Sequence, residues 1–224
     1  SERSKPPRRR MFHSFSAFHD TIIYADLQAV PFSDILKPSL QSEVEGMRLY
    51  FPVPAAAGPE GVLLRSFLRE CRLSTDLLRA VKFHGGGFAA DGASILANQR
   101  VFPGQTVSFA LPEEEGEGCL PDPSIPVQAV YQDFFALVLD KPAGLAVHPT
   151  LNYPGGTLAN GYAAWRQAGG RSAVFRPVNR IDKDTSGLVL AAQNAYAAPL
   201  LAQNVEKLYY AVAEGELPLG PGVI

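Results

Sequence analysis

The chain has 224 residues, of which 46% are hydrophobic, and its 20 basic and 22 acidic side chains give a net charge of −2. No apolar run reaches the roughly 18 residues that a transmembrane helix needs, so we expect no membrane span. Cys71 and Cys119 lie far apart in the sequence, which argues against a disulfide framework or a zinc knuckle and fits a reducing compartment. The four histidines show no metal-ligand spacing, so we expect no metal.

The acidic residues are concentrated in one segment. Residues 113–126 contain five of the acidic side chains and no Lys or Arg, which leaves 20 basic against 17 acidic side chains, a net charge of +3, in the rest of the chain. We predict that 113–126 is an acidic linker. The mildly basic remainder permits nucleic-acid binding without demanding it.

Residues 1–60 form a predicted N-terminal extension. Ser1 to Arg10 is basic and contains prolines, a composition that predicts disorder, and the remnant of an organelle-targeting segment stays open as an alternative. Residues 21–25 are apolar enough for a short strand, and the Ala-, Pro- and Gly-rich residues 52–59 are interpreted as a joint.

Residues 61–112 are predicted to form a small α/β module. Val62 to Cys71 carries apolar side chains at helical spacing, and Ser74 is placed to cap a second helix. Short strands are expected at 88–90 and 106–109. This order resembles the S4 RNA-binding module, as does the run from Val101 through Pro103 and Gly104 to Val107. The resemblance implies phosphate contacts from Arg65, Arg69, Arg72, Arg79 and Lys82; a solvated basic helical face is the alternative.

The segment from residue 127 onward is rich in predicted strands. Residues 127–131 and 134–139 are interpreted as a hairpin, 157–166 as a helix, and 194–205 as partly helical with Pro199 in the first turn. Residues 206–215 predict a strand. Its alternation places Tyr210 on one face with Leu208 and Val212, large apolar neighbours that predict a core position for Tyr210. Tyr209 lies on the other face among small side chains, where a ligand fits beside its ring.

A charged loop, residues 179–187, lies between two apolar runs. The second run, Leu188 to Ala192, is apolar at odd and even positions, which predicts a strand buried on both faces. The loop reads Asn-Arg-Ile-Asp-Lys-Asp-Thr-Ser-Gly, and its last four residues are typical of a turn. Positive charge on Arg180 and Lys183 favours the ionised form of Asp182 between them.

The loop resembles the catalytic motif of RluA-type pseudouridine synthases, His-Arg-Leu-Asp-x-x-Thr-Ser-Gly, with Asn179 and Ile181 as departures. Lys141-Pro142 through His148-Pro149 resembles the Lys-Pro-x-Gly-x-x-Val-His-Pro segment of the same family, and residues 207–215 resemble its Lys-x-Tyr-x-Ala-x-Val-x-Gly strand. The resemblance implies an α+β fold with a mixed, mainly antiparallel catalytic sheet over residues 127–224, preceded by the S4-like module. The family's later Gly-Arg-x-His-Gln-x-Arg-x-His strand has no match here, so a truncated sheet is expected.

The same resemblance implies an RNA substrate and no cofactor. Asp182 matches the essential aspartate, for which the roles of nucleophile and base both stay open. Arg180 matches the arginine that holds the flipped-out nucleotide, and Tyr209 matches the active-site tyrosine, placed to stack on the uracil. Lys183 is expected to contact RNA. We expect a loop uridine of ribosomal or transfer RNA as target, and a monomer that works in the cytoplasm, with an organelle not excluded.

Two other functions remain open from the sequence. A non-catalytic RNA-binding protein with an incomplete synthase domain is favoured by Asn179 and by the missing later strand. A hydrolase that uses Asp182 and Asp184 as a carboxylate pair is the weaker alternative, because a turn would separate the two side chains and no substrate motif accompanies them.

Overall fold

The structure is a computed structural model that describes residues 24–29, 48–113, 118–151, 153–212, 215 and 220, with the backbone alone for 24–29. Most of the predicted N-terminal extension, including Ser1 to Arg10, lies outside the described residues. So do residues 114–117 of the predicted acidic linker. None of the described helices has the length and apolar character that a membrane span requires.

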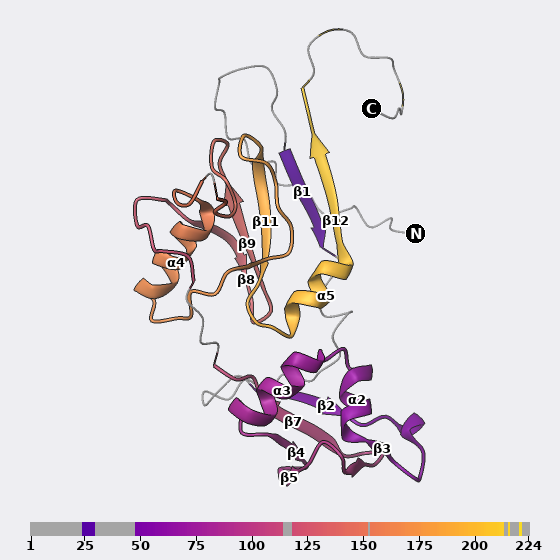
Figure 1. Cartoon of the computed structure of the whole chain (residues 1–224). Helices are drawn as coiled ribbons and strands as arrows, with labels where there is room; N and C mark the ends of the chain where they lie inside the picture. Colours follow the sequence, from indigo (N-terminus) through magenta and orange to yellow (C-terminus); the bar gives the residue numbers. More distant parts are fainter. Residues whose placement is uncertain are drawn as a thin grey trace, which may run out of the picture.

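Two β-sheets, one above the other in Figure 1, are joined through α5 and its surroundings. The lower sheet has the strand order β2-β7-β4-β5, and the pair β3-β6 lies beside it. Its elements are β2 (Arg48–Pro52), η1 (Ala55–Ala57), β3 (Val62–Leu63), α2 (Leu64–Glu70), α3 (Thr75–His84), β4 (Phe88–Ala90), β5 (Ala93–Ile95), β6 (Arg100–Val101) and β7 (Thr106–Ala110). The sheet takes in β2, which precedes the predicted start of the module at residue 61.

Local sequence explains the elements of this lower part. The backbone N–H of Leu77 donates to Ser74 Oγ at 3.1 Å, so Ser74 caps α3 as the sequence predicts. The first predicted helix begins at Leu64, because Val62 and Leu63 pair with β6 instead. Asp91 and Gly92 join β4 to β5 with φ values of 49° and 81°, a geometry that favours Asp-Gly in a tight hairpin. Leu49, Phe67 and Phe109 lie in the core beneath the two helices.

The upper sheet has the strand order β12-β1-β11-β9-β8, and β10 also pairs with β11. Its elements are β1 (Tyr24–Ala29), β8 (Gln128–Gln132), β9 (Ala136–Lys141), α4 (Leu158–Ala168), β10 (Arg176–Pro177), β11 (Ser186–Ala192), α5 (Ala197–Asn204) and β12 (Val205–Tyr210). Every pairing is antiparallel except that of β1 with β11. The predicted fold class, a mixed and mainly antiparallel α+β arrangement, is confirmed.

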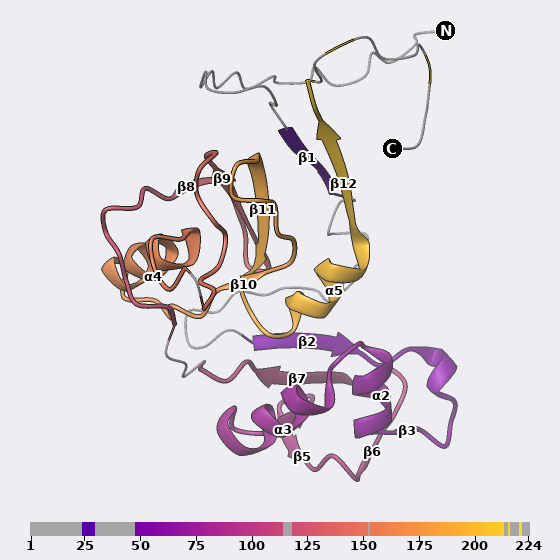
Figure 2. The same cartoon turned by 45° about the horizontal axis from the view of Figure 1, so that its top comes forward.

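Strand β11 lies between two cores, as the unbroken apolar run predicts. Val189 and Ala191 face a cluster with Leu158 and Tyr162 of the α4 layer. Leu190 and Ala192 face the opposite cluster, which continues without interruption into the lower sheet. Figure 2 shows α5 between the two sheets, so one hydrophobic core joins the upper and lower parts of the molecule.

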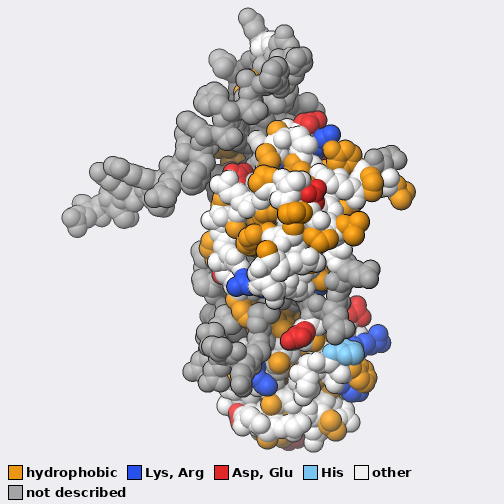
Figure 3. Space-filling model, turned by 90° about the vertical axis from the view of Figure 1, so that its left-hand side faces the viewer, with side chains coloured by type: hydrophobic (Ala, Val, Ile, Leu, Met, Phe, Trp, Pro, Cys, Tyr) orange, Lys and Arg blue, Asp and Glu red, His pale blue; other side chains and the backbone are white. Residues whose placement is uncertain are grey.

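The end strands of the upper sheet are exposed. Every residue of β8 is exposed, and Figure 3 shows hydrophobic side chains gathered on the upper half of the side that carries α4 and β8. At the other end, Tyr210 and Val212 are 49% and 61% exposed. The prediction that Tyr210 belongs to the core is therefore wrong, because β12 ends the described sheet and its residues after Val205 are exposed on both faces.

Tyr196 lies where the two parts of the molecule meet. Its ring packs edge-on to Phe51 at a centroid distance of 5.8 Å and lies 6.4 Å from Phe135. Its hydroxyl donates to the backbone carbonyl of Cys71 at 3.1 Å. Burial raises the pKa of Tyr196 far above its usual value, so the hydroxyl stays protonated as a donor. One side chain thus contacts the lower sheet, the upper sheet and the end of α2.

We predict that Tyr196→Ala lowers the free energy of unfolding by about 3–5 kcal/mol, because it leaves a cavity between the two parts. Tyr196→Phe keeps the ring and removes only the hydrogen bond, so it should cost about 1 kcal/mol. Urea denaturation followed by circular dichroism measures both. A loss below about 1 kcal/mol for the alanine variant would show that the two parts do not depend on this contact.

Candidate active site

The predicted catalytic loop runs along one edge of β11. Strand β10 ends at Pro177, and the N–H of Val178 then donates to the carbonyl of Leu190 at 2.7 Å. Asn179 and Ile181 are buried, whereas Arg180 and Asp182 are exposed. Although regular pairing ends at Pro177, this alternation places Arg180 and Asp182 on the solvent side.

Asn179 replaces the histidine of the motif, and the structure gives it a specific role. Its side-chain carbonyl accepts from the N–H of Leu190 at 2.7 Å, and its side-chain amide donates to the carbonyl of Leu188 at 3.0 Å. On this edge of β11, β1 pairs with residues 186–187 and β10 with residues 191–192. The amide of Asn179 therefore completes the hydrogen bonding in the gap between these two strands.

A turn follows, with Asp182 as its first residue. The N–H of Thr185 donates to the carbonyl of Asp182 at 3.2 Å, and Thr185 is buried. Gly187 then enters β11 with a φ of 132°, a backbone conformation that glycine adopts readily and other residues avoid. The turn leaves the side chains of Asp182, Lys183 and Asp184 exposed.

Lys141, the last residue of β9, forms a hydrogen bond with the backbone of this turn. It has no exposed surface, and its ammonium group donates to the carbonyls of Pro142, Leu145 and Lys183 at 2.9, 2.6 and 3.0 Å. Three acceptors satisfy all three N–H groups of an ammonium ion. The contact with the Lys183 carbonyl fixes the backbone immediately after Asp182.

Two opposing effects act on the charge of Lys141. Burial lowers the pKa of Lys141 to about 8, and the nearby carboxylates of Asp184 and Asp182 work in the opposite direction. A buried cation therefore lies near the two exposed carboxylates of the turn.

The other two charged residues of the loop, Arg180 and Lys183, lie near His148 and Tyr153. Burial, together with the positive charge of Arg180, lowers the pKa of His148, which favours the neutral imidazole. His148 also packs against Phe175, with ring centroids 5.3 Å apart. The ammonium group of Lys183 lies 4.8 Å from the ring centroid of Tyr153. Within the described residues, neither Arg180 nor Lys183 forms an ion pair with Asp182.

Strand register places Tyr209 on the same face of the sheet as the turn. Tyr209 pairs with Ala25, Ala25 pairs with Gly187, and Gly187 pairs with Lys141. Directly paired residues share a face, and Lys141 reaches the turn on that face. The backbones at Tyr209 and Gly187 are two strand spacings apart, roughly 10 Å. Tyr209 is 45% exposed, so its ring is available to a ligand.

The cations predicted to bind RNA lie in two places. Lys183 belongs to the turn. The five others are all exposed and lie on or next to the helices of the lower part: Arg65, Arg69, Arg72, Arg79 and Lys82. Their contacts with RNA stay a prediction, and the structure does not bring them to Asp182.

Sequence reasoning assigned no role to Lys141. The signal was present, because period-two alternation along β9 puts Lys141 on the same face as the fully buried Leu137 and Leu139. A lysine at a core position implies buried acceptors. Only the tertiary structure shows that these acceptors include carbonyls 4 and 42 residues away in the chain. The carboxylate of Asp184, the third residue of the turn, accepts no hydrogen bond from a described residue.

Comparison with known proteins finds a family model and relatives that match this part of the chain. The family model described as RNA pseudouridylate synthase matches residues 136–220, which include the turn, Lys141 and Tyr209. An uncharacterized RNA pseudouridine synthase of Bacillus subtilis, YlyB, is 36% identical over 147 residues, 62% of this chain and 48% of that protein. Ribosomal large subunit pseudouridine synthase D of Xanthomonas campestris is 33% identical over 203 residues, 88% of this chain and 56% of that protein. The chain spans about half the length of these relatives.

We predict that Asn179→Ala frees the amide of Leu190, because it removes the acceptor that lies 2.7 Å away. Hydrogen exchange at Leu190 should accelerate, and the free energy of unfolding should fall by about 1–3 kcal/mol because two buried backbone groups lose their partner. Asn204→Ala is the matched control: Asn204 is exposed and donates to the carbonyl of Leu200 at the end of α5. Unchanged protection of Leu190 in the Asn179 variant would contradict the assigned role.

We predict that Lys141 makes stability rise with pH in the alkaline range. Its folded pKa of about 8 lies below the unfolded value of about 10.4, so between these values the unfolded chain binds a proton that the folded chain lacks. Below about pH 8 the cost of burying the charge is present in full. The stability of the wild type relative to Lys141→Met should therefore increase by about 2 kcal/mol from about pH 8 to about pH 10.

Urea titrations of both proteins across this range measure the difference, and the subtraction removes groups that titrate equally in the two proteins. A difference that does not change with pH would show that Lys141 keeps its ordinary proton affinity.

Proposed function

We propose that this chain, whose residues 136–220 belong to the RNA pseudouridylate synthase family, isomerises a uridine in RNA to pseudouridine with Asp182 as the catalytic residue. The RNA pseudouridine synthases among its relatives support the reaction class. The relative from Xanthomonas campestris is named a ribosomal large subunit pseudouridine synthase, which supports ribosomal RNA as a substrate for this chain, with transfer RNA as the other candidate.

One observation carries the proposal: Asp182 is an exposed carboxylate on an immobilised backbone. Asn179 fixes the chain before it, Thr185 closes the turn through the Asp182 carbonyl, and Lys141 holds the carbonyl of Lys183. A catalytic group acts well when its supporting contacts hold it in place before the substrate arrives. A loop whose carboxylates served only to cap backbone groups would have no need for this support.

The reaction needs few chemical groups. The bond between N1 of uracil and C1′ of ribose breaks, the base turns, and C5 bonds to C1′; C5 then loses its proton and N1 gains one. No electron carrier is required, so we propose that no cofactor or metal takes part. Asp182 acts at the ribose, and the roles of nucleophile and base both balance the reaction.

The neighbours of Asp182 supply binding. A base in folded RNA must leave its stack to reach the carboxylate, and in this proposal the exposed guanidinium of Arg180 holds the extruded state. Tyr209 lies on the same face of the sheet and stacks on the uracil, an interaction worth about 1–3 kcal/mol per base. Lys183 contacts the RNA backbone. We further propose that residues 61–112 are an S4-like module whose helical cations add phosphate contacts.

The remaining expectations accompany this proposal. The chain acts as a monomer in the cytoplasm and binds no membrane. Its mildly basic character outside the predicted acidic linker suits an RNA target. A loop uridine is the preferred target, because its base is already partly unstacked.

The proposal is tested by label release. Ribosomal and transfer RNA labelled with tritium at uridine C5 are incubated with the wild type and with Asp182→Asn. The wild type should release label, and Asp182→Asn should lower the rate by about three orders of magnitude or more, because the carboxylate that acts at the ribose is gone. Asp184→Asn removes the same charge two residues away and should keep more than about a tenth of the activity.

Other outcomes select the alternatives. RNA binding without label release from the wild type would identify a non-catalytic RNA-binding protein. Release of free uracil would identify a hydrolase. An equal loss of label release in the Asp182 and Asp184 variants would show that activity depends on the negative charge of the turn and not on Asp182 in particular.

A further inference from the structure

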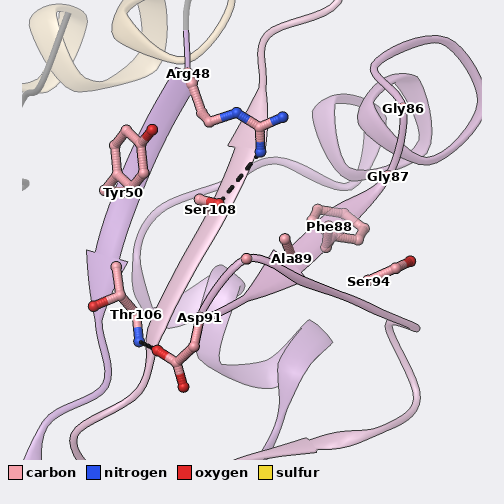
Figure 4. A pocket seen from close by; sticks show the side chains of 11 residues that line it. Arg48, Tyr50, Gly86, Gly87, Phe88, Ala89, Asp91, Ser94, Thr106 and Ser108 are labelled. Atoms are coloured by element: carbon pink, nitrogen blue, oxygen red, sulfur yellow. Dashed lines mark hydrogen bonds between the residues drawn. The ribbon is translucent and has the colours of Figure 1, made fainter. Parts of the chain in front are cut away.

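A cleft of about 670 Å³ lies on the lower sheet, away from the proposed active site. It is formed by β2, β7, β4 and β5 together with the glycine-rich segment after α3, and Figure 4 shows it from close by. Its lining residues are Arg48, Tyr50, Gly86, Gly87, Phe88, Ala89, Asp91, Gly92, Ser94, Thr106 and Ser108. The volume falls within the range of small-molecule sites, roughly 300–1,000 Å³.

The cleft lies on the outer face of the sheet, opposite the helices. Leu49, Phe51 and Phe109 point into the core with α2 and α3, so the residues that alternate with them, Tyr50 and Ser108, point to the other side. This outer face is separate from the helical cations for which RNA contacts are predicted.

Strand register explains why a cleft forms here. Tyr50 pairs with Ser108, Ser108 with Ala89, and Ala89 with Ser94. One row across four strands therefore carries a large aromatic side chain followed by three small ones. Because side chains of one row stand on the same face, the small residues make a shallow floor and the ring of Tyr50 makes a wall beside it (Figure 4).

The charges at the two ends of the cleft differ in availability. The carboxylate of Asp91 is occupied, because it accepts from the N–H of Thr106 at 2.8 Å and from the side-chain amide of Gln105 at 3.1 Å. The exposed guanidinium of Arg48 makes one hydrogen bond within the described residues, to Ser108 Oγ at 3.3 Å (Figure 4). A guanidinium has five donors. The donors left for a ligand are therefore those of the Arg48 guanidinium.

We propose that this cleft binds one nucleotide of single-stranded RNA, with a phosphate on Arg48 and the base against the ring of Tyr50. Arg binds phosphate through paired N–H groups, and aromatic rings stack bases of any sequence. The small floor admits a flat base, and a paired base within a duplex has no exposed face to offer. The inference rests on the proposed function for the choice of RNA, and it adds a binding site outside the catalytic loop.

Equilibrium binding of a short fluorescein-labelled oligouridylate to the full chain tests the proposal. Tyr50→Leu removes the ring and should weaken binding about tenfold or more, whereas Tyr50→Phe keeps it and should stay within about twofold of the wild type. Arg48→Gln should reduce the slope of log K against log salt by roughly 0.7, the value of one phosphate contact in a single strand. Arg48→Lys keeps the charge and should keep the slope.

One control separates a contact in this cleft from a general loss of positive charge. Arg171→Gln makes the same charge change at an exposed position after α4 and should leave the slope unchanged. Circular dichroism confirms that each variant folds.

Equal affinities of the Leu and Phe variants, or an unchanged salt slope in Arg48→Gln, would overturn the proposal and leave the cleft to another ligand such as a protein segment. This failure differs from failure of the proposed function. If the wild type releases no label but binds RNA through Tyr50 and Arg48, only the isomerase assignment is wrong. If the wild type releases label and the cleft variants bind RNA normally, only the proposed cleft site is wrong.

Discussion

The buried ammonium group of Lys141 is the constraint on which the upper part of the structure depends. A cation without exposed surface must find an acceptor for each N–H group, or its burial costs several kcal/mol. Lys141 meets this requirement with the carbonyls of Pro142, Leu145 and Lys183. The ammonium group therefore holds together the end of β9, the segment that follows it and the turn after Asp182. The requirement that stabilises the fold also places the proposed catalytic carboxylate.

Strand β11 gives this point its surroundings. One of its edges pairs with β9, and the other is shared by β1, the side chain of Asn179 and β10. An asparagine suits the gap because its amide offers one donor and one acceptor, as a backbone peptide does. The departure from the family motif at 179 is thus explained by the hydrogen bonding of β11. It leaves Arg180 and Asp182 exposed, and so it does not by itself argue against catalysis.

The two parts of the molecule share one core, so their surfaces are not independent. The cluster behind Leu190 and Ala192 continues through Tyr196 to Phe51 of the lower sheet. Phe51 neighbours Tyr50, the wall of the cleft, on the same strand. A substitution at Tyr196 therefore removes packing from the lower sheet as well as from the upper one. An RNA that occupied both proposed sites would contact two parts that share one hydrophobic core.

The sequence by itself determined the local elements: the Ser74 cap of α3, the α4 helix and the doubly buried β11 all follow from patterns within a few residues. Only the tertiary structure decided that β1 lies between β11 and β12, that Lys141 binds a carbonyl 42 residues away, and that Tyr50 stands in a row with Ser108, Ala89 and Ser94. It also corrected Tyr210, whose alternation indicates a face without telling what covers it. The reason is physical. Periodicity records which side of its own backbone a residue occupies, whereas pairing and the partners of a buried charge depend on distant segments that no local pattern identifies.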